Sequence, residues 1–184
     1  MKKPFLIGIC LALLWCLIKL SFFLLNYDQP DYLKWFVMLN MLLATLTVSL
    51  SIYESKKRLP GQNLLMDVKN GISGGLLYTV VVSFFLFFYY QNINKQYNIS
   101  QLQQREKEIS LALDDPKNMA EIKSQKPEWR SLSKNELVDE LKKNASVFFS
   151  PKFTMTISLL ALLLYVTVNS LLIALIFRRF LFLK

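Results

Sequence analysis

The sequence predicts an all-α membrane protein with four transmembrane helices and a helical extracytoplasmic segment between the third helix and the fourth. Hydrophobic residues make up 53% of the 184 residues, and they gather in long, almost uncharged runs. A bilayer core of about 30 Å needs about 20 apolar residues in a helix, because backbone polar groups in lipid must be satisfied within the segment. Four stretches meet this length, and they are residues 5–25, 35–53, 71–90 and 153–177.

The first stretch contains one charge, Lys19, and both cysteines of the chain, Cys10 and Cys16. Six positions place the two thiols on different sides of a helix and too far apart for a disulfide. A basic start followed by an apolar run is also typical of a secretory signal peptide. Because no small-residue cleavage site follows, we expect a retained transmembrane helix.

Small residues recur along the first and third stretches. Helices in lipid associate where small side chains let two backbones approach closely. The expected helix-packing residues recur every four positions in their stretch, and they are Gly71, Gly75, Thr79, Gly8 and Ala12. Ser83 extends this spacing in the third stretch, and Cys16 extends it in the first.

Residues 91–152 form the only segment large enough to act outside the bilayer. The lack of Gly and Pro between Tyr90 and Asp115 predicts that the third helix continues beyond the membrane until Pro116. Ser133 and Glu136 form a capping-box pattern that opens a second helix, and residues 117–130 are expected to be a looser link. The predicted division is therefore 1–90 for three spans, 91–152 for the outer segment, and 153–184 for the fourth span and a basic tail.

The basic residues favour one side of the membrane, where only Glu54 and Asp67 oppose them. The cytoplasmic side of a membrane protein carries the excess of Lys and Arg. We therefore expect both termini and residues 54–70 to be cytoplasmic, and residues 91–152, with eleven basic against nine acidic residues, to be extracytoplasmic. The net charge of +9 is then mainly an orientation signal, and no nucleic-acid partner is expected. The predicted cytoplasmic basic anchors are Lys56, Lys57, Arg58, Arg178 and Arg179.

Lys19 is the residue of the spans with the largest free-energy cost of burial in lipid, because a charge inside a bilayer needs a partner or a route to water. At 1.5 Å per residue, Lys19 and three polar residues of the other spans fall about 7–11 Å below the outer surface. This candidate intramembrane polar layer consists of Lys19, Asn40, Ser83 and Ser158. One hypothesis is a site for an anionic group or a lipid headgroup. The other is structural, with the Lys19 stem carrying its amine toward the headgroups.

Familiar catalytic patterns are missing from the sequence. It contains 0 His, and neither a phosphate-binding Gly-rich loop nor a CxxC or HExxH pattern occurs. Asp114 and Asp115 are adjacent, and Asp before Pro116 is more typical of a turn than of an acid–base pair. We expect no enzymatic activity, no catalytic residues, no cofactor and no metal site.

Three segments of the chain resemble a bacterial family of four-span membrane proteins, the domain of unknown function 4199. The first is residues 1–5, and the second leads from Tyr53 into residues 67–71 (DVKNG). The third is residues 113–116 (LDDP), in the outer segment. The resemblance implies a bacterial inner membrane of a two-membrane cell, and it implies no active site.

The leading functional hypothesis is a non-enzymatic accessory or assembly subunit of a cell-envelope complex. Its expected surroundings are the lipid bilayer and a membrane-protein partner or further copies of the chain. The alternative is a small transporter, channel or lipid-binding membrane protein that uses the polar layer around Lys19. A third hypothesis is a sensor whose outer segment reads a ligand and signals through another subunit.

Overall fold

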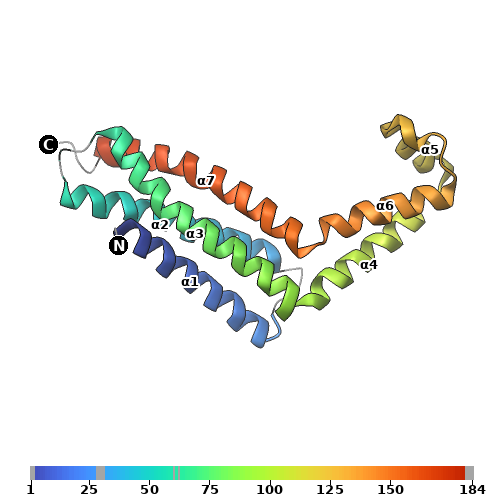
Figure 1. Cartoon of the computed structure of the whole chain (residues 1–184), viewed down its shortest axis with the longest axis horizontal. Helices are drawn as coiled ribbons and strands as arrows, with labels where there is room; N and C mark the ends of the chain where they lie inside the picture. Colours follow the sequence, from blue (N-terminus) through green and yellow to red (C-terminus); the bar gives the residue numbers. More distant parts are fainter. Residues whose placement is uncertain (1–2, 28–31, 60, 62, 181–184) are drawn as a thin grey trace. The chain divides into compact units, whose positions relative to one another are not determined.

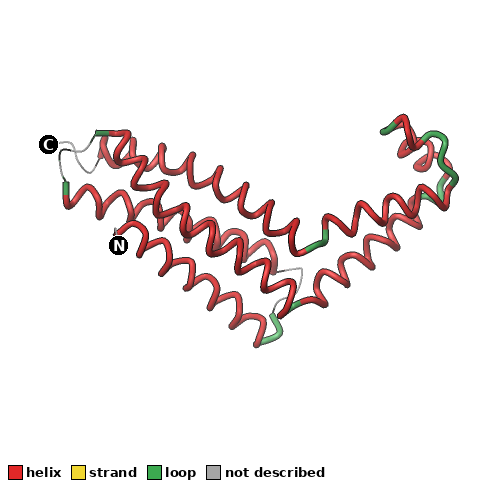
Figure 2. Tube along the Cα trace, viewed as in Figure 1, coloured by secondary structure: helices red, strands yellow, loops and turns green. Residues whose placement is uncertain are grey.

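Four long apolar helices dominate the computed structural model, which describes residues 3–27, 32–59, 61 and 63–180. They are α1 (Lys3–Leu24), α2 (Leu33–Arg58), α3 (Leu64–Phe88) and α7 (Pro151–Phe180) (Figure 1). Their most apolar windows have a mean hydropathy between 1.8 and 2.5, which qualifies each as a membrane span. Figure 2 shows only helices and loops among the described residues. The predicted all-α fold with four spans is confirmed.

The chain divides into two compact units. Unit 1 comprises Met1–Phe85 and Thr156–Lys184, and therefore holds most of the four long helices. Unit 2 comprises Leu86–Met155, and holds the shorter helices that lie between the third and fourth spans in the sequence.

The helices of unit 1 are longer than the apolar runs that predicted them. α2 has 26 residues and α3 has 25, which corresponds to nearly 40 Å each, more than the ~30 Å of a bilayer core. α2 therefore continues through its basic last turn, and α3 begins seven residues before its apolar run. As a result, Asp67 and Lys69 lie on a helix in a segment that the sequence predicted to be a polar loop.

The C-terminus of α1 is closed by a residue in the left-handed backbone conformation. Asn26 has a φ of 60°, and its N–H donates to the carbonyl of Phe23 at 3.0 Å. The N–H of Tyr27 donates to the carbonyl of Phe22 at 2.9 Å. These two bonds form a Schellman motif, which satisfies carbonyls that the end of a helix leaves open.

Unit 2 begins with a break in the predicted extension of the third helix. A π-helical turn (Tyr89–Ile93) follows α3, and Asn94 then caps a new helix, α4 (Lys95–Ala112), by accepting from the N–H of Tyr97 at 3.1 Å. The prediction of one continuous helix to Pro116 was therefore wrong in detail. The π turn adds a residue to the helical repeat, which the absence of Gly and Pro did not reveal.

The predicted loose link between residues 117 and 130 was also wrong. Pro116 opens α5 (Pro116–Gln125), and the side chain of Asp115 caps this helix by accepting from the N–H of Lys117 at 2.9 Å. A 3₁₀ turn (Pro127–Trp129) follows. Pro is tolerated at the first position of a helix, because its missing N–H would have no partner there.

The last helix of unit 2, α6 (Lys134–Phe148), begins at the predicted capping box. The Ser133 N–H donates to the Glu136 carboxylate at 2.7 Å, and the Glu136 N–H donates to the Ser133 hydroxyl. α6 packs against α4 around a small core. The buried members of this core are Ile109, Leu113, Trp129, Leu137 and Ala145.

The capping box makes α6 sensitive to acid. Hydrogen bonds from the backbone and then the side chain of Ser133 hold the pKa of the Glu136 carboxyl below its usual range. Because the folded pKa is lowered, the cap stabilises above the ordinary Glu range and is lost as the pH falls through the lowered pKa. We expect the protection of the Ser133 amide against hydrogen exchange to fall on acidification.

Glu136→Gln provides the control for this expectation, since Gln keeps the acceptor oxygen but does not titrate. In that variant, the protection of the Ser133 amide should be independent of pH over the same range. An equal pH dependence in both proteins would contradict the role of the Glu136 carboxylate.

Candidate functional site

A group of charges around one buried carboxylate lies at the end of unit 1 where α2 ends and α3 begins. The Lys56 Nζ lies 2.7 Å from the Asp67 Oδ2, and the exposed fractions of these side chains are 6% and 1%. The Nε of Arg178, on α7, lies 3.4 Å from the same oxygen. We call these three residues the Asp67 cluster, and the end of unit 1 that contains them the basic end. The cluster connects three spans through one carboxylate.

The positions of these charges on their helices favour the arrangement. Asp67 lies in the first turn of α3, where the helix dipole is positive, and Lys56 lies in the last turn of α2, where the dipole is negative. A buried ion pair loses its hydration, and only close geometry and further hydrogen bonds offset that loss. The other carboxylate oxygen, Asp67 Oδ1, is buried and accepts no hydrogen bond from any described residue.

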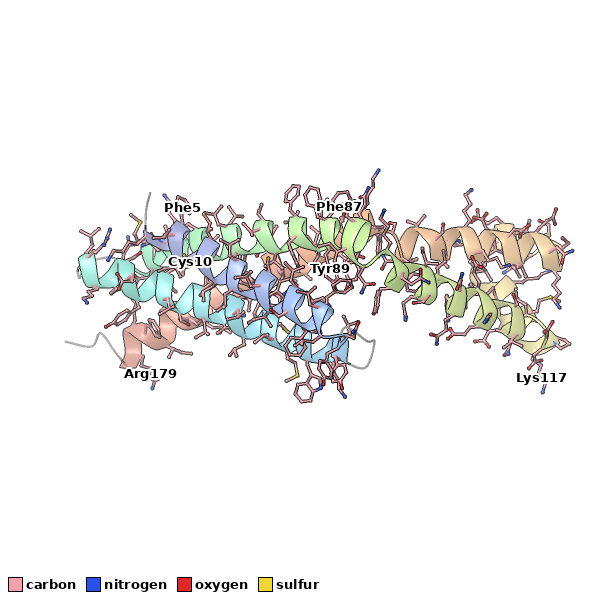
Figure 3. The ribbon with its side chains drawn as sticks, turned by 90° about the horizontal axis from the view of Figure 1, so that it is seen from below. Phe5, Cys10, Phe87, Tyr89, Lys117 and Arg179 are labelled. Carbon is pink, nitrogen blue, oxygen red and sulfur yellow. The ribbon has the colours of Figure 1, made fainter. Side chains whose placement is uncertain are left out.

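A second ion pair connects α1 to the basic end. The Lys3 Nζ lies 2.9 Å from a carboxylate oxygen of Glu54, on α2, and both side chains are more exposed than those of Lys56 and Asp67. All four spans therefore have a charged contact at this end. Arg179, labelled in Figure 3, is exposed at the end of α7.

The five predicted basic anchors fall into two groups. Lys56, which is buried, and Arg178, which is exposed, face Asp67. Lys57, Arg58 and Arg179 are exposed and lie outside the Asp67 cluster. Asp67, the centre of the cluster, entered the sequence reasoning as a loop charge and as part of the DVKNG segment, and no partner was predicted for it. The signal that could have found it is helical: the segment after Gln62 has no Pro or Gly until Gly71, so α3 can begin early enough to include Asp67.

The glycines of α3 and α1 lie where helices meet most closely. A Cβ atom added to Gly75 would fall on Val166 of α7, and one added to Gly71 would lie 2.9 Å from the Ser170 Oγ of the same helix. A Cβ added to Gly8 would fall on the carbonyl oxygen of Gly74. Ala12 and Thr79 are fully buried.

Sequence reasoning missed Gly74, although it lies in two close contacts. A Cβ added there would fall on the Ser51 Oγ of α2, in addition to the contact between its carbonyl and Gly8 of α1. Gly74 does not fall on the four-residue spacing of Gly71 and Gly75, because it faces different helices. A single spacing pattern describes only one face of α3, whereas α3 contacts α1, α2 and α7.

The four residues of the predicted polar layer have different surroundings. Lys19 is 2% exposed, and its Nζ lies 4.1 Å from the centroid of the Phe36 ring on α2. A desolvated ammonium over an aromatic face is a favourable arrangement. Ser83 is fully buried, and its hydroxyl has no hydrogen-bond partner in the described part of the chain. Ser158 is half-buried.

Asn40, the fourth residue of the layer, is bonded to α3. Its side-chain oxygen accepts a hydrogen bond from the Tyr78 hydroxyl at 2.5 Å, and its backbone carbonyl lies 3.2 Å from the same hydroxyl. Tyr78 is fully buried. The sequence selected Asn40 for its depth, but it contained no signal that Tyr78 would be its partner.

We expect Tyr78→Phe to lower stability modestly. The substitution removes the hydroxyl and leaves the half-buried Asn40 amide oxygen without this donor, and interhelical hydrogen bonds in membrane proteins contribute about 0.6 kcal/mol on average. Unfolding in mixed micelles, compared with Asn40→Leu and the double variant, measures the coupling between the two side chains. Strictly additive losses would contradict a direct bond.

The surface of unit 2 is hollowed beside its core. One open cavity of about 510 Å³ lies against Trp129 and Ile109, with Arg105 and Lys126 among its lining residues. A second, of about 470 Å³, also borders Trp129, and besides Lys143 it is lined mainly by acidic residues. These are Glu128, Glu136, Asp139 and Glu140. Unit 2 therefore presents a largely apolar hollow and an acidic hollow to its surroundings.

Comparison with known proteins yields one match. A family model described as "Protein of unknown function (DUF4199)" matches residues 6–179, which is nearly the whole chain. No curated protein and no solved structure matches. The resemblance inferred from the three sequence segments is confirmed.

Proposed function

This chain belongs to the DUF4199 family, and we propose that it is a non-enzymatic accessory or assembly subunit of a cell-envelope complex. In this proposal it lies in a bacterial inner membrane with its basic end in the cytoplasm, as the excess of Lys and Arg favours. Unit 2 then lies outside the cytoplasm and contacts the partner.

The observation that carries this proposal is that unit 2 has its own core and a charged surface. Trp129 and Leu137 are buried between its helices, and mixed charges cover the outside. The acidic hollow beside Trp129 is lined by four carboxylates and one ammonium, that of Lys143, and this acidic excess is complementary to a basic partner. Interfaces of this kind combine an aromatic anchor with a polar rim.

The packing of unit 1 supports a structural role for the spans. Gly8, Gly71 and Gly75 bring α3 into close contact with its neighbours. Three spans also share the buried Asp67 carboxylate. Helices held in this way serve as a rigid membrane anchor for unit 2.

The test is purification of the chain from its native membranes in a mild detergent. We expect a stoichiometric partner, either another protein or a second copy, that dissociates when Asp139→Lys and Glu140→Lys reverse the charge of the acidic hollow. The matched control reverses Glu106 and Glu108, which lie on α4 and do not line that hollow. A strictly solitary species, or equal loss of the partner in both variants, would contradict the proposal.

A further inference from the structure

We propose that unit 1 contains a binding site for one anionic phospholipid between α1 and α3 at the basic end. The site is an open groove of about 490 Å³. Phe5 contributes from α1, and the remaining lining comes from α3. The α3 residues are Leu65, Val68, Lys69, Ile72, Ser73 and Leu76. The inference does not depend on the proposed role as a subunit.

The lining suits a lipid tail. Six of the seven lining side chains are uncharged, and five of those six are pure hydrocarbon. From Lys69 to Leu76 the groove follows α3 for about 10 Å, most of one leaflet of a ~30 Å bilayer core. Phe5, labelled in Figure 3, lies near the start of α1, where this leaflet begins at the basic end.

Lys69 supplies the charge that selects the headgroup. It is exposed, and its side chain forms no ion pair or hydrogen bond with any residue that the structure describes. The neighbouring cations differ, since Lys3 is paired with Glu54, and Lys56 and Arg178 with Asp67. Lys69 is therefore an unneutralised ammonium beside an apolar groove, which is complementary to a phosphate joined to an acyl chain.

The depth of Lys69 is consistent with headgroup contact. It lies five residues after the start of α3, about 8 Å along the helix, and Asp67 and Lys56 lie at a similar level. A Lys side chain can extend along apolar surface and place its amine in the headgroup region. The groove continues from this level toward Leu76, so one molecule can occupy both parts.

The experiment measures lipid retention on the full chain in mild detergent by native mass spectrometry. The probes are phosphatidylglycerol and phosphatidylcholine with identical acyl chains. We expect the chain to retain phosphatidylglycerol preferentially, and Lys69→Gln to weaken that binding about fivefold, the effect of about one surface charge. The matched control is Lys57→Gln, which removes an exposed charge at the same end but does not line the groove.

Two further measurements distinguish lipid binding in the groove from lipid attraction by general surface charge. Ser73→Phe keeps Lys69 but fills the groove, and it should abolish the preference while the unfolding midpoint shows that the variant is folded. A large excess of glycerol phosphate should not displace the lipid. Equal effects of Lys57→Gln and Lys69→Gln, equal retention of both lipids, full binding to Ser73→Phe, or displacement by glycerol phosphate would each overturn the proposal.

Discussion

Asp67→Asn is expected to lower the free energy of unfolding by about 3–5 kcal/mol, the usual effect of removing one partner from a buried ion pair. The substitution leaves the Lys56 ammonium buried at 5% exposure without the negative charge that lies 2.7 Å away. It also removes the counterion of Arg178 on α7. The measurement is equilibrium unfolding in mixed micelles, followed by tryptophan fluorescence.

Glu54→Gln is the matched control, because it neutralises a carboxylate at the same end of unit 1. Its partner, Lys3, is half-exposed, so solvent screens the pair and the loss should be much smaller. The double variant Lys56→Met with Asp67→Leu should regain most of the stability, since apolar residues of similar volume often replace buried ion pairs without loss. Equal effects of Asp67→Asn and Glu54→Gln would show that burial of the pair has no energetic consequence.

Gly8→Leu is expected to destabilise unit 1 by about 3 kcal/mol or more, at the upper end of overpacking effects. The first atom of the new side chain would fall on the Gly74 carbonyl oxygen, and it would lie 3.3 Å from the Tyr78 backbone nitrogen. Backbone atoms cannot rotate aside as a side chain can. α1 and α3 must therefore separate, which disturbs contacts along both helices.

Gly8→Ala should also lower stability, although Ala has the better helix propensity by about 1 kcal/mol. Gly61→Ala is the control, because a Cβ there meets nothing within 4 Å, and its unfolding midpoint should stay near that of the unmodified chain. A stable Gly8→Leu variant would show that the close contact between α1 and α3 is not required.

The capping box shows which features local sequence predicts well. Its two hydrogen bonds join residues three positions apart, so Ser133 and Glu136 were sufficient to predict where α6 begins. The π turn at Tyr89–Ile93 and the helix that starts at Pro116 were missed. No local signal marked the π turn, whereas Asp115 followed by Pro116 is a helix-start pattern that was interpreted as a turn.

The sequence by itself determined the four spans and their small-residue faces, because bilayer thickness and backbone hydrogen bonding impose a length and a polarity on each segment. Only the tertiary structure decided which charges meet. Asp67 lies 11 positions from Lys56 and is also paired with Arg178, on the last span. Such contacts depend on the register between helices, and register depends on where close-packed positions such as Gly8 and Gly74 meet.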